Sequence, residues 1–134
     1  MRIVFASGCA PWPFSRGGAE ISAGTLMRGL RQRAHQVHVF GSLDNYIFSE
    51  ARSLPDAARV LSERNIDATW HTSWQGQCPD CTYARYAAGG VSITAVEREA
   101  HLADLLRAHV LEEPPDIIVT QLNRSHLVAE VAAA

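Results

Sequence analysis

A pair of glycines between an apolar run and an amphipathic segment constrains this chain more than any other feature. The apolar run covers residues 3–6, a loop follows, and Gly17-Gly18-Ala19-Glu20 opens the amphipathic segment. Glycine lets the backbone turn sharply and approach a ligand closely, because it has no Cβ. The first amide donors of a helix have no partner within it, and the helix dipole adds partial positive charge there. Strand, glycine loop and helix start together predict an anion-binding site.

The residue before the glycine pair strengthens this prediction. Arg16 offers a guanidinium group that can bind a phosphate through two parallel hydrogen bonds. The spacing alone is equally consistent with a structural role, in which Gly17 and Gly18 only let the strand pack against the helix. Both interpretations stay open at this point.

Composition excludes several classes of function. The chain has 134 residues, of which 47% are hydrophobic, so it fits one domain (residues 1–134) with a substantial core. Its formal net charge is −2, and nothing in this balance favours nucleic acid or an anionic membrane as a partner. All 12 basic residues are arginines, which excludes a lysine nucleophile, a Schiff base and a Walker-type phosphate lysine.

The sequence shows neither a membrane span nor a signal peptide. No segment approaches the roughly 18 consecutive apolar residues that a span needs, and the N-terminus lacks a charged, then apolar, then small-residue pattern. The three cysteines, Cys9, Cys78 and Cys81, do not suggest a secreted disulfide framework. We therefore expect a cytoplasmic protein.

The spacing Cys78-Pro79-Asp80-Cys81 is typical of a redox pair or of half a zinc site. A tetrahedral site needs four ligands, and only Cys9 and His71 are plausible additions. Two ordinary thiols in a loop is the interpretation that we favour, so we expect no metal and no resident cofactor.

Strand-like and helix-like segments alternate along the chain. We expect strands at residues 2–7, 36–40, 90–96 and 116–120, and helices at residues 19–33, 55–65 and 97–112, with another helix beginning at residues 125–134. Residues 41–53 read as a loop. Residues 70–86 read as irregular, and we interpret their aromatic side chains as packing a long loop onto the sheet in preference to binding a sugar.

This alternation predicts a Rossmann-like, doubly wound parallel sheet that is incomplete at its C-terminal end. In such sheets ligands bind outside the carboxyl ends of the strands. The glycine loop and the loop after Thr120 both belong there, so two separate segments point at one cleft. A dinucleotide-dependent oxidoreductase does not fit, because the sequence has no G-x-G-x-x-G and no acidic residue after the second strand.

Five short motifs in order carry a resemblance to a known family. They are Arg2-Ile3-Val4-Phe5, Gly17-Gly18-Ala19-Glu20, Arg33-Ala34-His35-Gln36-Val37-His38-Val39, Gly90-Val91 and Pro115-Asp116-Ile117-Ile118. With this order and spacing the chain resembles the N-terminal, acceptor-side domain of GT-B glycosyltransferases of family 4. Residues 43–88 do not contribute to the resemblance.

The resemblance implies half of a two-domain enzyme that transfers a sugar from a nucleotide-sugar to an acceptor with retention. Gly17 and Gly18, aided by Arg16, would contact the donor diphosphate. The acceptor would lie against Trp12 and Phe14 in the glycine loop. The missing C-terminal domain would complete catalysis, so the 134-residue chain alone is expected to be inactive and to carry no catalytic residue. The nucleotide-sugar is then a substrate, and no cofactor is implied.

Two departures from the family pattern matter. Ala34 stands where the family commonly has a glycine that ends the first helix in a left-handed turn, which would cost roughly 1 kcal/mol of strain. Thr120-Gln121-Leu122-Asn123 stands where many members have a histidine. Gln121 and Asn123 can hydrogen-bond an acceptor hydroxyl, but Gln121 cannot act as a base.

A second function class stays open beside the enzyme. In it the chain is a non-catalytic, stand-alone α/β module whose sheet edge and alanine-rich tail pair with another copy or with a partner chain. The two classes differ in what they predict: weak diphosphate binding at the glycine pair for the first, and a defined oligomer without it for the second.

Overall fold

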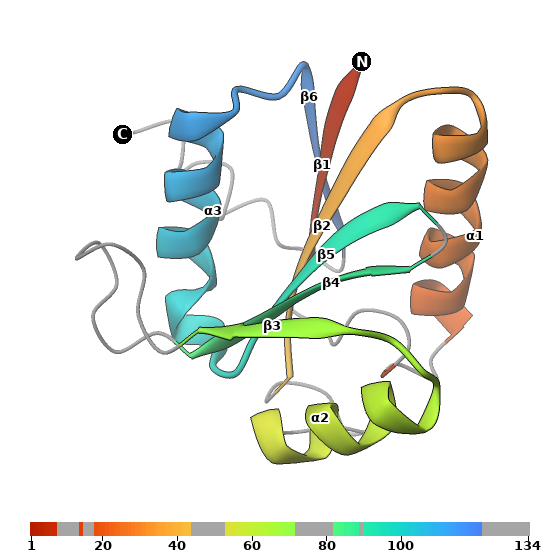
Figure 1. The fold of residues 1–134 in the computed structure, drawn as a ribbon. Helices are drawn as coiled ribbons and strands as arrows, with labels where there is room; N and C mark the ends of the chain where they lie inside the picture. Colours follow the sequence, from red (N-terminus) through yellow and green to blue (C-terminus); the bar gives the residue numbers. More distant parts are fainter. Residues whose placement is uncertain (8–13, 15–17, 44–52, 72–81, 89, 122–134) are drawn as a thin grey trace.

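A six-stranded sheet with helices on both faces forms the body of the protein in a computed structural model (Figure 1). The structure describes residues 1–7, 14, 18–43, 53–71, 82–88 and 90–121. Along the chain the elements are β1 (Arg2–Ser7), α1 (Gly18–Gln32), β2 (Gln36–Ser42), α2 (Leu54–Glu63), β3 (Ala68–His71), β4 (Tyr83–Ala88), β5 (Val91–Val96), the 3-10 turn η1 (Glu99–His101), α3 (Leu102–Glu112) and β6 (Ile117–Gln121). The helix expected at residues 125–134 lies outside the described residues.

The strand order confirms the expected fold class. The sheet runs β3-β4-β5-β2-β1-β6, and β5, β2, β1 and β6 are parallel to one another. Numbered in chain order, these four strands give the order 3-2-1-4 that lies at the centre of a Rossmann-like sheet. The long apolar runs of β1 and β2 form central strands because both of their faces are covered.

The expectation for residues 70–86 was wrong in part, because this region contains strands. β4 pairs antiparallel with β5, and β3 pairs antiparallel with β4, so the sheet is mixed at this end. The sequence of β4 does not alternate between apolar and polar residues, because both faces of this strand are buried. Tyr83 lies in the core on one face of the sheet, and Ala84 and Tyr86 lie in the core on the other. The two tyrosines pack into the core, as we had interpreted them, whereas Trp70 on β3 is 42% exposed.

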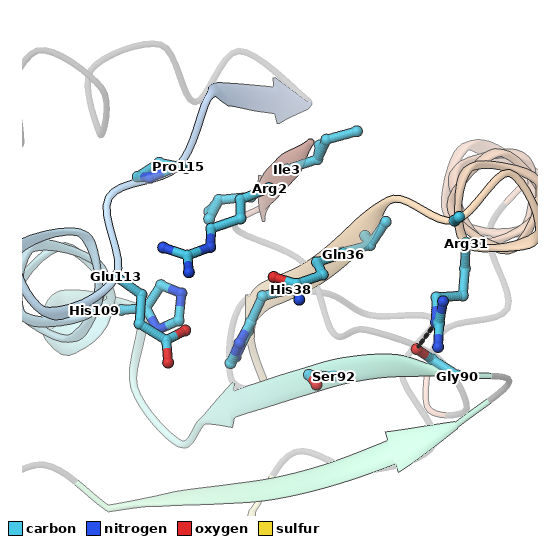
Figure 2. Close-up of a pocket in the computed structure, with 13 residues that line it drawn as sticks. Arg2, Ile3, Arg31, Gln36, His38, Gly90, Ser92, His109, Glu113 and Pro115 are labelled. Carbon is cyan, nitrogen blue, oxygen red and sulfur yellow. Dashed lines mark hydrogen bonds between the residues drawn. The ribbon is translucent and has the colours of Figure 1, made fainter.

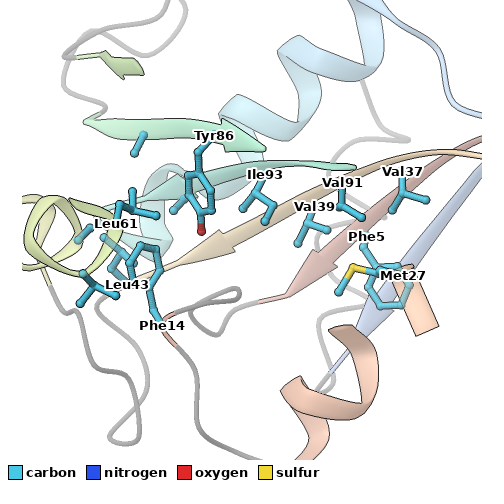
Figure 3. Packing of buried hydrophobic residues seen from close by; sticks show 14 of the residues in the cluster. Phe5, Phe14, Met27, Val37, Val39, Leu43, Leu61, Tyr86, Val91 and Ile93 are labelled. Carbon is cyan, nitrogen blue, oxygen red and sulfur yellow. The ribbon is translucent and has the colours of Figure 1, made fainter. Parts of the chain in front are cut away.

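Alternate residues of the strands supply two separate apolar clusters. Ile3, Phe5 and Val39 lie on the face that packs against α1 and α2, together with Phe14 (Figure 3). The opposite face packs against α3 and includes Val4 among its buried residues. In Figure 1, α1 and α3 accordingly lie on opposite sides of the sheet.

The buried stripe of α1 is narrower than its spacing suggests. Met27 is buried and Leu30 is half-buried against the sheet, but Leu26 is 54% exposed. Leu111 on α3 is also 64% exposed. The buried residues of α3 form one broad face, and Leu111 lies on the opposite side of the helix.

Helices α1 and α2 end in the same way. Ala34 has a φ of 68°, and the amide of His35 donates to the carbonyl of Leu30 at 3.2 Å. At the end of α2, Asn65 has a φ of 56°, and the amide of Ile66 donates to the carbonyl of Leu61 at 2.9 Å. Both are left-handed helix ends of the Schellman type. The left-handed turn expected at Ala34 is therefore present, with alanine in place of glycine.

The three α-helices that the structure describes are 10 to 15 residues long. None of them is long and apolar enough to cross a membrane.

Candidate functional site

The carboxyl ends of the four parallel strands lie at one edge of the sheet. The last residue of β1, Ser7, is the backbone partner of Gln121, the last residue of β6. Ser42 at the end of β2 is likewise the partner of Val96 at the end of β5. Ligands of open α/β sheets bind beyond this edge, and it is the edge at which the sequence predicts the site.

Two of the predicted site residues have a described place in this arrangement. Gly18 is the first residue of α1, which is the helix that follows β1. Gln121 ends β6 directly beside the end of β1. The structure therefore brings the end of β1, the strand that precedes the glycine loop, and the last residue of β6 to the same edge. The remaining calls on Arg16, Gly17, Trp12 and Asn123, and those on the three cysteines, lie outside the described residues.

Phe14 is the one aromatic residue of the glycine loop that the structure describes, and its side chain is in the core. It is 0% exposed. Its ring lies 5.9 Å from the ring of Tyr86 in an edge-to-face arrangement at 77° (Figure 3). Such packing accounts for an aromatic residue here without any ligand. Acceptor binding by Phe14 stays a prediction. What the structure shows is that its side chain packs in the core.

A second group of polar residues gathers at the opposite, amino-terminal end of the parallel strands. It lines a hollow of about 400 Å³ on the α3 side of the sheet, which we call the amino-end hollow (Figure 2). Residues from the starts of the strands and from the end of α3 contribute to it, among them Arg2, Gln36, His38, Ser92, His109 and Glu113.

Two histidines of this group, His38 and His109, lie next to each other. Nε2 of His38 lies 2.8 Å from the hydroxyl oxygen of Thr94, which is fully buried. The His38 ring stacks on Phe40 with centroids 4.6 Å apart, and it lies 4.4 Å from the ring of His109. The sheet and α3 thus meet through aromatic rings here, while most of the other side chains in this interface are aliphatic.

Both histidines are held in the neutral form. Burial lowers the pKa of His38 to about 3, and repulsion from Arg85 and from the protonated form of His109 acts in the same direction. Burial also lowers the pKa of His109, against the opposing effect of the nearby Glu113 carboxylate. At neutral pH each ring therefore offers one N–H donor and one acceptor nitrogen and carries no charge.

Only weak sequence signals point to this histidine pair. His109 follows Leu106 by three residues, which places it on the buried face of α3, and His38 alternates with the buried Val37 and Val39 on β2. Scattered histidines such as these are typical of the surface or of the edge of the core. His109 is instead 7% exposed, and only the fold brings it to His38, which is 71 positions earlier in the chain.

Within the part of the chain that the structure describes, no group of three or more His, Cys, Asp or Glu side chains could hold a metal ion.

Comparison with known proteins identifies the fold. No protein-family model matches the sequence, and no curated protein matches it. Among solved structures, the catalytic domain of starch synthase IV from Arabidopsis thaliana, bound to ADP and acarbose, matches with a TM-score of 0.55. The match covers 88% of this chain and 27% of that one, at 12% sequence identity. The NMR solution structure of ALG13 matches 89% of this chain and 55% of that one, at 12% identity and a TM-score of 0.45.

The chain thus spans about a quarter of the starch synthase domain and about half of ALG13. The starch synthase match supports the Rossmann-like fold that the resemblance implied.

Proposed function

We propose that this chain is the acceptor-side domain of a glycosyltransferase and that its glycine loop contacts the diphosphate of a nucleotide-sugar donor. A second domain would bind the rest of the donor and complete a transfer with retention. The observation that carries the proposal is the register of β1 and β6, in which Ser7 and Gln121 are partners at the carboxyl edge of the sheet. The helix that follows β1 begins at Gly18, so its first amides belong to this edge.

The fold match supports the proposal. The starch synthase domain that shares this fold binds ADP, which carries the diphosphate group that we assign to the glycine loop. In the proposed site the backbone amides of Gly17 and Gly18 donate to the diphosphate, and Arg16 adds a fixed positive charge. Gln121 and Asn123 would hydrogen-bond acceptor hydroxyls on the neighbouring strand end. No residue of the chain is assigned the role of catalytic base.

The test is calorimetric titration of the chain with nucleoside diphosphates and the matching monophosphates. We expect weak binding of a diphosphate and at least about tenfold weaker binding of the monophosphate. Arg16→Gln should weaken diphosphate binding about tenfold or more, since a hydrogen bond to a charged group contributes about 1.5–3 kcal/mol. Arg28→Gln is the matched control, because Arg28 is exposed on α1 and its replacement removes the same charge.

Absence of binding by any nucleoside diphosphate, or equal losses in the two variants, would contradict the proposal. The intact mass in the native source gives an independent check. We expect a polypeptide well above the 14.7 kDa of this chain, because the second domain has to be present for transfer.

A stand-alone binding or oligomerisation module is the second candidate. The observation in its favour is that β3 is an edge strand of the sheet and exposes 42% of the large side chain of Trp70. Exposed edge strands can pair with another chain. Light scattering that shows a defined oligomer, together with no diphosphate binding, would favour this candidate over the first.

A further inference from the structure

The size and position of the amino-end hollow suit a small-molecule site. Its volume of about 400 Å³ falls within the range of small-molecule pockets, roughly 300–1,000 Å³. It lies at the starts of the parallel strands, as its lining residues Arg2, Gln36 and Gly90 show, and so at the opposite end of the sheet from the glycine loop. A ligand bound there is independent of the proposed donor site.

His109 supplies the first sign that the hollow takes a ligand. His109 is 7% exposed, and its ring makes no hydrogen bond to another residue that the structure describes. Its ring nitrogens are not among the fully buried polar atoms that lack a partner, so they remain accessible to solvent. Because His109 lines the hollow, a group bound in the hollow can accept a hydrogen bond from its ring.

Arg2 supplies the second sign. Its backbone is held on both sides by Asp116, whose carboxylate accepts from the Arg2 amide at 2.8 Å and whose own amide donates to the Arg2 carbonyl at 2.8 Å. Figure 2 shows the Arg2 guanidinium extending from β1 toward His109 and Glu113 at the end of α3. No ion pair or side-chain hydrogen bond joins this guanidinium to another described residue.

By contrast, Arg31 at the far side of the hollow is already engaged. Its Nε donates to the carbonyl of Gly90 at 3.0 Å (Figure 2). A Cβ at Gly90 would lie 3.1 Å from Cγ of Arg31, so the arginine packs closely over the turn before β5. Arg31 therefore forms a wall of the hollow, while the Arg2 guanidinium is available to a ligand.

We propose that the amino-end hollow binds a small hydroxylated molecule that carries a carboxylate or a phosphate group. The forked guanidinium of Arg2 and the N–H of neutral His109 hold the oxyanion. The side chains of Gln36 and Ser92 and the carboxylate of Glu113 also line the hollow and hydrogen-bond the hydroxyl groups. The negative charge of Glu113 selects against a ligand that is anionic throughout and in favour of one with hydroxyl donors beside its anionic group.

The experiment uses the imidazole resonances of His109 and His38 in NMR spectra of the full chain at neutral pH. The probes are glycerol phosphate as a hydroxylated phosphate, glucuronate as a hydroxylated carboxylate and glucose as the neutral control. We expect a saturable shift of the His109 signals with at least one of the two anions and none with glucose. Whichever anion binds more tightly identifies the source of the oxyanion.

Two variants make the outcome specific to Arg2. Arg2→Gln should weaken anion binding about tenfold or more, and Arg2→Lys should restore part of it, because lysine keeps the charge but loses the fork. Arg59→Gln is the control, since Arg59 is exposed on α2 and does not line the hollow. The proposal is overturned if neither anion shifts the His109 signals saturably, or if Arg2→Gln and Arg59→Gln bind the anion equally well.

Discussion

The two faces of the sheet are formed by the same strands, but their side chains differ in polarity. The face that packs against α1 and α2 is covered by apolar side chains from one end of the strands to the other. The face that packs against α3 is apolar toward the carboxyl ends, around Val96 and Leu102, and polar toward the amino ends, around His38 and His109. The first face stabilises the fold, while the second leaves polar groups available at the amino-end hollow.

The helices on the two faces also end differently. Those on the apolar face, α1 and α2, close with left-handed residues that satisfy their last carbonyls. On the polar face, α3 ends with the amide of Glu113 on the carbonyl of His109 at 2.8 Å, and Pro114 and Pro115 then prevent further helix. The end of α3 is therefore where the chain presents charged side chains to the hollow.

The largest expected effect comes from truncating a buried side chain on the apolar face. Phe14→Ala should lower the free energy of unfolding by about 3–5 kcal/mol, because it removes a fully buried ring that packs on Tyr86. Urea unfolding measures this change, and Leu26→Ala on the exposed side of α1 is the control, with an expected loss below about 1 kcal/mol. A loss below about 1 kcal/mol for Phe14→Ala as well would remove the core role and return Phe14 to the predicted acceptor site.

The polar face should make stability depend on pH. The folded pKa of His38, about 3, lies below its unfolded value, so the unfolded chain takes up the proton first as the pH falls below about 6.5. Stability is complete above this pH and decreases by about 1.4 kcal/mol per pH unit below it, or about 2 kcal/mol by pH 5. The lowered pKa of His109 adds to the effect in the same direction.

Urea unfolding between pH 5 and pH 7.5 measures this slope. In the double variant His38→Leu with Thr94→Val the two partners of the 2.8 Å hydrogen bond are removed together, so no buried group is left unpaired. In this variant the free energy of unfolding should depend less steeply on pH, whatever its absolute value. If the slope is unchanged, His38 on the α3 face does not cause the pH dependence of the free energy of unfolding.

The smallest expected effect concerns the helix end on the apolar face. Ala34→Gly should raise the free energy of unfolding by about 1 kcal/mol, since glycine adopts the φ of 68° without strain. The same replacement at Ala58, exposed in the middle of α2, should lower it by about 1 kcal/mol. Thermal or urea unfolding of the two variants should therefore shift in opposite directions, and a loss of stability in Ala34→Gly would contradict the left-handed helix end.

The central fold could be predicted from the sequence because each of its elements carries a local signal. The strands β1, β2, β5 and β6 are apolar runs, and α1 and α3 show helical spacing between such runs. The strands β3 and β4 have no such signal. β3 has four residues, and in β4 Tyr83 and Ala84 are both buried, so the polarity does not alternate along the strand.

The candidate site could be predicted from the sequence only where the order of strands and helices along the chain determines which segments meet. The pairing of Ser7 with Gln121 follows from the parallel topology, which the alternation of elements predicts. The contact of His38 with Thr94 and His109 depends on which residues face one another across β2, β5 and α3. A single sequence does not contain that information, because side-chain pairing between elements is set by the packing of the whole sheet.

The position of β1 has a consequence for how the chain folds during synthesis. Of the strands that the structure describes, β1 is made first, yet it lies between β2 and β6, and Ile3 pairs with both Val37 and Ile117. At about 5–20 residues per second, the ribosome delivers Ile117 roughly ten seconds after Ile3. One edge of β1 therefore has no partner while the residues between β1 and β6 are translated, and this contact between strands far apart in the sequence is the step that we expect to limit the rate of folding.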